Sequence, residues 1–153
     1  GPHTRRIAYW FVLGRAALFQ QLADENVSRG QALAARLTFP LLGRALRRRL
    51  GVDRPGFERS MTRVRRVADD VAARLEDGRA YLTGDAFTAA DLTFAALSAP
   101  VILPGPDRYG ARLPPLERFC DEGRRTITTF RDHPAGRFAA RVYEAHRVRG
   151  PRR

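Results

Sequence analysis

The stretch Gly84-Asp85-Ala86-Phe87-Thr88-Ala89-Ala90-Asp91-Leu92 (GDAFTAADL) carries the pattern of a helix start inside a folded core. The first turn of a helix leaves backbone N–H groups without partners, and such groups are costly when buried. Thr88 and Asp91 have the spacing of a capping box, in which each side chain bonds the backbone of the other residue. Phe87 and Leu92 occupy the two positions of a hydrophobic staple. We therefore interpret these four residues as a structural cap and expect no catalytic role for Asp91.

The segments on either side of this cap have clear helical patterns. The residues after it, as far as about Ile102, are nearly all small or apolar, which is typical of a helix buried on every side. The segment before it starts near Pro55, ends near Gly78 and has an apolar residue at every third or fourth position: Phe57, Met61, Val64, Ala68, Val71 and Leu75. This spacing predicts one long amphipathic helix.

Helical patterns also fill the rest of the chain, and strand patterns barely appear. We expect a helix from about Pro2 to Glu25 with a bend or break at Gly14, and one capped by Ser28 that runs to Leu50. Pro40 should kink this second helix or divide it in two. Two further helices are predicted, over 116–130 and from Pro134 onward.

The sequence thus predicts an all-α bundle of five to seven helices. We expect one domain over residues 1–146, followed by a basic tail over 147–153 that frays. The composition of the 153 residues, 44% hydrophobic and 29% charged, is that of an ordinary globular chain.

The sequence lacks the patterns of several protein classes. No apolar run approaches the roughly 18 residues that span a bilayer, and the N-terminus lacks a signal-peptide pattern. We therefore expect a cytoplasmic protein with no membrane partner. Cys120 is the only cysteine, and neither it nor the three histidines have the spacing of metal ligands, so we predict no metal site.

The net charge of +12 raises the question of a nucleic-acid partner. Every basic residue is arginine, which indicates codon bias at least as much as phosphate recognition, and net charge does not establish a binding function. The stretch from Leu46 to Pro55 has the rhythm of a helix-turn-helix, followed by Arg59, Arg63 and Arg66. Arg47 falls where that motif normally has a small residue, and the second helix is about twice the usual length. Nucleic-acid binding is therefore the less favoured alternative.

A longer string around the cap is more specific than the cap alone. Tyr81-Leu82-x-Gly84-Asp85-x-Phe87-Thr88-x-Ala90-Asp91-Leu92, after a helix that ends in Leu75-Glu76-Asp77-Gly78, resembles the all-helical C-terminal domain of the glutathione S-transferases. Phe130-Arg131-Asp132-x-Pro134-Ala135-Gly136-x-Phe138 and Gly1-Pro2-His3-x-Arg5-Arg6-x-Ala8-Tyr9 are similar to segments of bacterial members of that family. The resemblance covers nearly the whole chain.

The resemblance implies only part of an enzyme. Family members begin with a thioredoxin-like half that binds glutathione and supplies the Ser, Tyr or Cys that activates its thiol. No segment here matches that half, so no catalytic residue is carried over, and we expect this chain alone to bind no cofactor. Glutathione is implied for the parent family. If the first three residues are native rather than a cloning remnant, the chain begins part-way into a family helix.

The helical domain of this family contributes most of the pocket for the hydrophobic co-substrate and part of a homodimer interface. By that resemblance, the co-substrate would meet the first helix and the 104–115 loop. The candidate contacts are Tyr9, Leu13 and Tyr109, with Arg5 and Arg6 as anion contacts. The alternative is that Tyr9 and Leu13 are core residues and that Arg5 and Arg6 are surface residues without a ligand-binding role. A non-catalytic scaffold and a small-molecule-binding domain of another kind are further alternatives.

Overall fold

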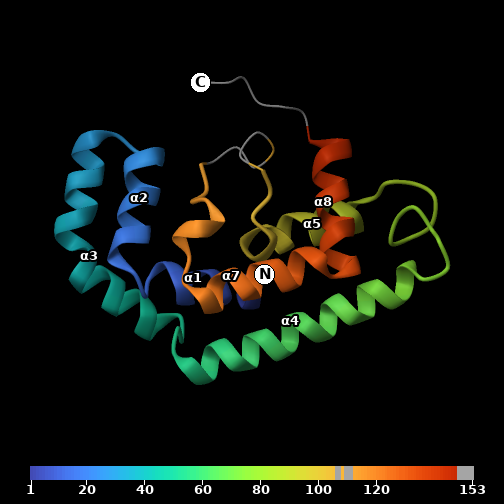
Figure 1. Cartoon of the computed structure of the whole chain (residues 1–153), viewed down its shortest axis with the longest axis horizontal. Coiled ribbons are helices and arrows are strands. Elements are labelled where there is room, and N and C mark those ends of the chain that lie inside the picture. Colours follow the sequence, from blue (N-terminus) through green and yellow to red (C-terminus); the bar gives the residue numbers. More distant parts are fainter. Residues whose placement is uncertain (106–107, 109–111, 148–153) are drawn as a thin grey trace.

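The computed structural model describes residues 1–105, 108 and 112–147, and these residues form an all-helical structure (Figure 1). The described part holds seven α-helices and one short 3₁₀ turn: α1 (Pro2–Val12), α2 (Ala16–Asn26), α3 (Arg29–Arg49), α4 (Arg54–Leu75), α5 (Ala89–Ile102), η1 (Leu116–Arg118), α7 (Asp121–Asp132) and α8 (Pro134–His146). The prediction of an all-α chain is confirmed over this part. Of the predicted basic tail, only Arg147 is among the described residues.

Helix α4 runs along one side of the molecule, and α1, α7 and α8 lie against the same side of it (Figure 1). Its start is capped by Asp53, whose carboxylate accepts from the Gly56 N–H at 2.6 Å. Its 22 residues give a length of about 33 Å. The apolar stripe predicted for this helix enters the core, where Phe57 and Val71 are among the buried members.

Helix α5 packs against α1, α7 and α8. Its inner face is formed by buried small and branched residues: Ala95, Ala99, Val101 and Ile102. The prediction that this helix is buried on every side is wrong. Leu92 and Leu97 are 57% and 43% exposed, because no described element covers the outer face of the helix.

The N-terminal helical segment breaks around Gly14, where α1 ends and α2 begins. Helices α2 and α3 then form a hairpin that stands at one end of the molecule (Figure 1). The rings of Phe19 and Phe39 stack between them at 4.2 Å. Helix α3 remains a single helix through Pro40, which is exposed and removes one backbone donor from the helix.

The prediction of a helix over 116–130 is wrong for its first turn. The 3₁₀ turn η1 ends at Arg118, and Phe119 and Cys120 are extended before α7 begins at Asp121. The extended backbone lets the Phe119 side chain enter the core, where it is 5% exposed. Tertiary burial of one ring therefore overrides the local helical pattern. Helix α8 buries Phe138, Val142 and Tyr143, as predicted.

The cap of α5 is built around the Asp91 carboxylate, which has no exposed surface. Thr88 is the N-cap residue, and the two residues form a capping box. One Asp91 oxygen accepts from the Leu82 N–H at 2.8 Å, and the other accepts from the Thr88 N–H at 2.8 Å and the Thr88 hydroxyl at 2.9 Å. Burial acts to raise the pKa of Asp91, but these hydrogen bonds outweigh it and hold that pKa below its ordinary value.

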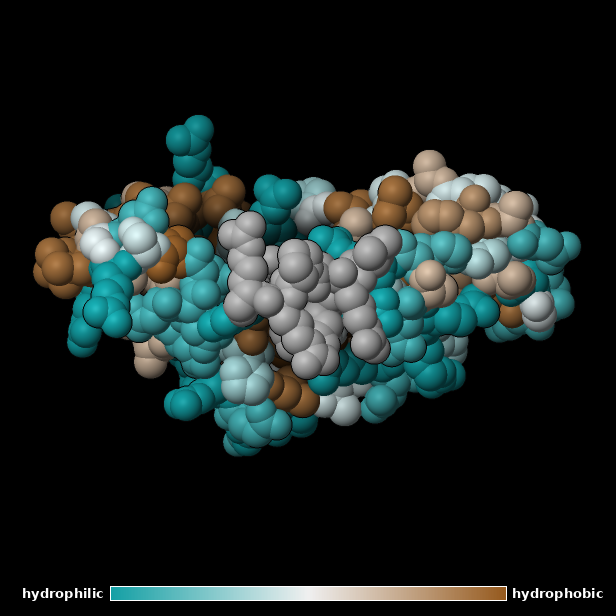
Figure 2. All heavy atoms as spheres, turned by 90° about the horizontal axis from the view of Figure 1, so that it is seen from above, coloured by the Kyte–Doolittle hydropathy of each residue, from teal (hydrophilic) through white to brown (hydrophobic). Residues whose placement is uncertain are grey.

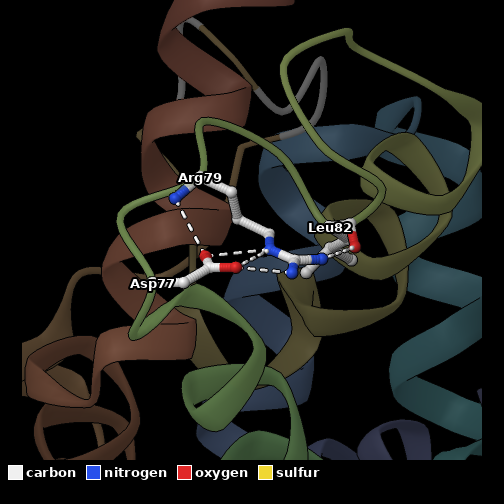
Figure 3. Close-up of polar contacts among 3 residues, drawn as sticks. All are labelled: Asp77, Arg79 and Leu82. Atoms are coloured by element: carbon white, nitrogen blue, oxygen red, sulfur yellow. Dashed lines mark hydrogen bonds and ion pairs between the residues drawn. The ribbon is translucent and has the colours of Figure 1, made fainter.

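Besides Asp91, Arg79 also stabilises the connection from α4 to α5 (Figure 3). Its guanidinium contacts both Asp77 carboxylate oxygens, at 2.5 to 2.9 Å, and donates to the Leu82 carbonyl at 3.5 Å. The Leu82 N–H thus donates to Asp91, and the Leu82 carbonyl accepts from Arg79. The hydrogen bonds from Arg79 lower the pKa of Asp77 from 3.8 to about 2.

The buried carboxylate should matter more for stability than the hydroxyl beside it. We expect Asp91→Ala to lower the free energy of unfolding by about 3 kcal/mol or more, because it leaves two backbone N–H groups without acceptors. Thr88→Ala should cost about 1 kcal/mol. The matched control is Thr93→Ala at an exposed position of the same helix. Urea unfolding measures all three, and equal midpoints for the Asp91 and Thr93 variants would contradict the assignment.

The ion pair in the connection predicts a specific pH dependence. Because the folded pKa of Asp77 is lowered, the pair stabilises the fold above the ordinary value of 3.8, and this contribution disappears as the pH falls through about 2. We expect NMR titration of the carboxyl carbon to give a pKa of about 2 in the native chain. Arg79→Gln should return that pKa toward 3.8, and a native value already near 3.8 would show that the pair does not form in solution.

Candidate functional site

A cavity of about 390 Å³ lies between α1, α5 and α7, and we call it the α1–α5 cavity. Its volume falls in the range of small-molecule sites. Most of its wall is apolar, with contributions from four helices: Ile7, Ala8, Phe11 and Val12 of α1, Leu22 of α2, Ala96, Leu97, Pro100 and Val101 of α5, and Ile127 of α7. Leu113 and Pro114, from the 104–115 loop, complete it.

Two of the predicted site residues, Arg5 and Tyr9, lie together in the wall of this cavity. They are four residues apart on α1, the spacing that places two side chains side by side on one helix face. Arg5 is exposed and Tyr9 is half-buried. Neither side chain hydrogen-bonds or forms an ion pair with another residue of the described part. Both polar groups are therefore free to bind a ligand.

A third polar residue contributes to the wall of this cavity and also to a groove between α4 and α7. Thr126 of α7 lines the cavity and is 8% exposed. Its hydroxyl has no hydrogen-bond partner within the described ranges, although threonines elsewhere in the helices, such as Thr62, bond the carbonyl four residues before them. The wall of the cavity therefore includes a guanidinium and a phenol among mostly apolar side chains.

The other predicted site residues lie elsewhere. Arg6 points away from the cavity: its Nε donates to the Leu50 carbonyl and its Nη1 to the Ser60 hydroxyl, both at 3.0 Å. Leu13 is buried and lines a different groove, next to α3. Tyr109 lies outside the described residues. The structure thus brings Arg5 and Tyr9 together and gives Arg6 a role in joining α1 to the start of α4.

The residues of the cap are placed apart from this cavity. The Phe87 ring stacks on His146 at 3.8 Å and packs edge-on against Tyr81 at 5.8 Å. Leu92 lies largely in solvent. None of Phe87, Thr88, Asp91 or Leu92 lines the α1–α5 cavity.

One histidine–serine contact could suggest nucleophilic chemistry, but its geometry does not support that role. His3 Nδ1 lies 3.3 Å from the Ser60 hydroxyl, which also accepts from Arg6. Burial, followed by the nearby charges of Arg6 and Arg63, lowers the pKa of His3. Ser60 has no exposed surface, so a substrate cannot reach its oxygen. This contact holds α1 against α4.

Groups of acidic, histidine or cysteine side chains that could bind a metal ion are absent from the described part of the chain. No helix in that part is long and apolar enough to cross a membrane.

No protein-family model, no curated protein and no solved structure matches this chain.

Proposed function

We propose that the α1–α5 cavity binds a small hydrophobic molecule that carries an anionic group. The observation that supports this proposal is the pairing of an apolar wall with two unpartnered polar side chains, Arg5 and Tyr9, on one helix face. Ligand sites usually combine a large apolar surface with a few polar groups that fix orientation. A carboxylate or sulfonate would bind the guanidinium of Arg5, and the phenol of Tyr9 would donate to it or to a neighbouring acceptor.

We further propose that the chain is the C-terminal, co-substrate-binding domain of a glutathione S-transferase-like protein. The all-helical structure and the cap at Thr88 and Asp91 are consistent with that family's helical domain, and the cavity involves α1 and the 104–115 loop, where the resemblance implies a co-substrate. Conjugation joins the glutathione sulfur to an electrophilic carbon while a leaving group departs. That step needs a thiolate, and in the family the group that activates the thiol comes from the thioredoxin-like half, so we propose that this chain depends on such a half for conjugation.

Binding can be tested with a matched pair of probes. We expect calorimetry to show that naphthalene-2-sulfonate binds the chain more tightly than the neutral 2-naphthalenemethanol. Arg5→Gln should weaken the sulfonate about tenfold and leave the neutral probe unchanged, since a hydrogen bond to a charged group contributes about 1.5–3 kcal/mol. Tyr9→Phe should have a smaller effect in the same direction.

Two controls make this test specific to the cavity. Ala96→Trp places a large ring in the cavity wall at an exposed position of α5 and should abolish binding of both probes without unfolding the chain. Arg59→Gln removes an exposed guanidinium of α4 that does not line the cavity and should change nothing. If Arg5→Gln and Arg59→Gln weaken sulfonate binding equally, the affinity depends only on the net charge of the chain, and the proposal would fail.

A separate experiment addresses the transferase assignment. We expect the pure 153-residue chain to give no conjugation of glutathione to an electrophilic aryl halide above the uncatalysed rate, measured by absorbance of the product. Turnover that scales with the concentration of the chain would show that it contains its own thiol-activating group, and the assignment as a co-substrate-binding half would be wrong.

A further inference from the structure

The outward side of α3 presents a row of leucines to solvent. Leu33, Leu37 and Leu41 are 58%, 73% and 81% exposed. They follow one another at intervals of four residues, so they form a single row along the helix. The opposite side of α3 packs against the rest of the chain, since Ala32 is buried and the Phe39 ring stacks on Phe19 of α2. Arg44 and Arg48 continue this row at helical spacing, and we call the three leucines and these two arginines the α3 outer face. Hydrophobic residues gather at the same end of the molecule (left in Figure 2).

The charge on α3 has one sign. The helix contains six arginines and no acidic residue: Arg29, Arg36, Arg44, Arg47, Arg48 and Arg49. Within the described ranges only Arg47 has a partner, through a hydrogen bond to the Val52 carbonyl at 3.4 Å and a contact with the Trp10 ring. By contrast, Arg54 and Arg79 pair with carboxylates at 2.5 Å. The α3 outer face therefore offers unneutralised positive charge next to exposed leucine.

A groove of about 550 Å³ lies along the C-terminal half of α3, between this helix and Leu13 and Val52, and it shares Arg44 and Arg48 with the α3 outer face. Its wall combines apolar side chains with three guanidinium groups: Leu13, Phe39, Pro40 and Val52 together with Arg44, Arg47 and Arg48. The groove wall also includes Asp53, whose carboxylate is occupied by the Gly56 N–H. A ligand that suits this groove is an anion attached to an apolar body.

We propose that the α3 outer face binds an anionic lipid surface. A helix with leucine on one side and arginine beside it lies in the plane of a membrane, with the apolar side chains in the boundary between headgroups and acyl chains. Each arginine near an anionic surface adds to the attraction. In this arrangement the leucine row enters the boundary, and Arg44 and Arg48 contact headgroup phosphates. The expectation of no membrane partner rested on the absence of a spanning segment, and a helix that lies on the surface needs none.

Two other occupants fit the face less well. A second copy packed face to face would bring two sets of unpaired arginines to one interface without a carboxylate from either α3. A nucleic acid would neutralise the arginines but leave the leucine row in water. An anionic lipid surface satisfies both the charge and the apolar row. The inference does not depend on what binds in the α1–α5 cavity.

Vesicle flotation tests this inference with the intact chain. We expect binding to vesicles of phosphatidylcholine with phosphatidylglycerol, little binding to phosphatidylcholine alone, and weaker binding as the salt concentration rises. The double substitution Leu37→Ser/Leu41→Ser should weaken binding to the anionic vesicles at least tenfold. Arg44→Gln/Arg48→Gln should weaken it about thirtyfold. Circular dichroism should show unchanged helix content in both variants, because these four side chains are exposed.

The controls remove the same chemistry from other places. Leu92→Ser removes a leucine that is as exposed as Leu33 from a different helix. Arg59→Gln/Arg66→Gln removes two exposed charges from α4. Both controls should retain at least half of the native binding to anionic vesicles.

Several results would overturn the inference. These are failure to bind anionic vesicles, equal loss in the α3 and control variants, and equal binding to neutral vesicles. Sedimentation that shows a dimer broken by Leu37→Ser/Leu41→Ser, without vesicle binding, would assign the face to a second copy. Tight DNA binding in gel-shift assays that the arginine pair abolishes and the leucine pair leaves intact would assign it to nucleic acid.

Discussion

A single buried carboxylate fixes the start of α5. Asp91 has no exposed surface, and its two oxygens accept from the backbone of Leu82 and from both the backbone and the hydroxyl of Thr88. A buried charge persists only when it is paired or fully hydrogen-bonded, and here backbone groups supply the bonds. Because α5 packs against α1 and α7 and the three helices line the cavity together, the position of its first turn sets the position of the cavity wall.

The sequence predicted most features that depend on local spacing. The capping box, the long stripe of α4 and the break at Gly14 follow from residues a few positions apart, and each appears in the structure. Features that depend on distant residues were missed. The hydrogen bond from the Leu82 N–H to Asp91 crosses a turn, and the extended backbone at Phe119 depends on the packing of its ring in the core. Arg5 and Arg6 differ only in their neighbours, since Arg6 bonds Ser60 of a distant helix. Adjacent residues on a helix differ in direction by about 100°, so only the position of the partner elements distinguishes them.

The arginines of this chain fall into two groups with different roles. Some are bonded inside the structure, as Arg6 is to Leu50 and Ser60, and these join helices together. Others, such as Arg5 on α1 and Arg44 on α3, have no partner in the described part of the chain and line a cavity or groove with apolar side chains. The net charge of +12 does not distinguish these groups. The location of each unpaired guanidinium beside a cavity or a leucine row indicates what kind of anion it would meet.

Native-state hydrogen exchange of the Leu82 and Thr88 amides would show whether the Asp91 carboxylate holds the start of α5. Both amides lie at the connection before the helix, where amides without bonded partners exchange rapidly. If the carboxylate holds them, they exchange only through global unfolding, at the same free energy as the core amide of Ala99. Exchange as fast as that of the exposed residues Asp85 and Ala86 would show that the connection opens independently and that the carboxylate does not fix the helix.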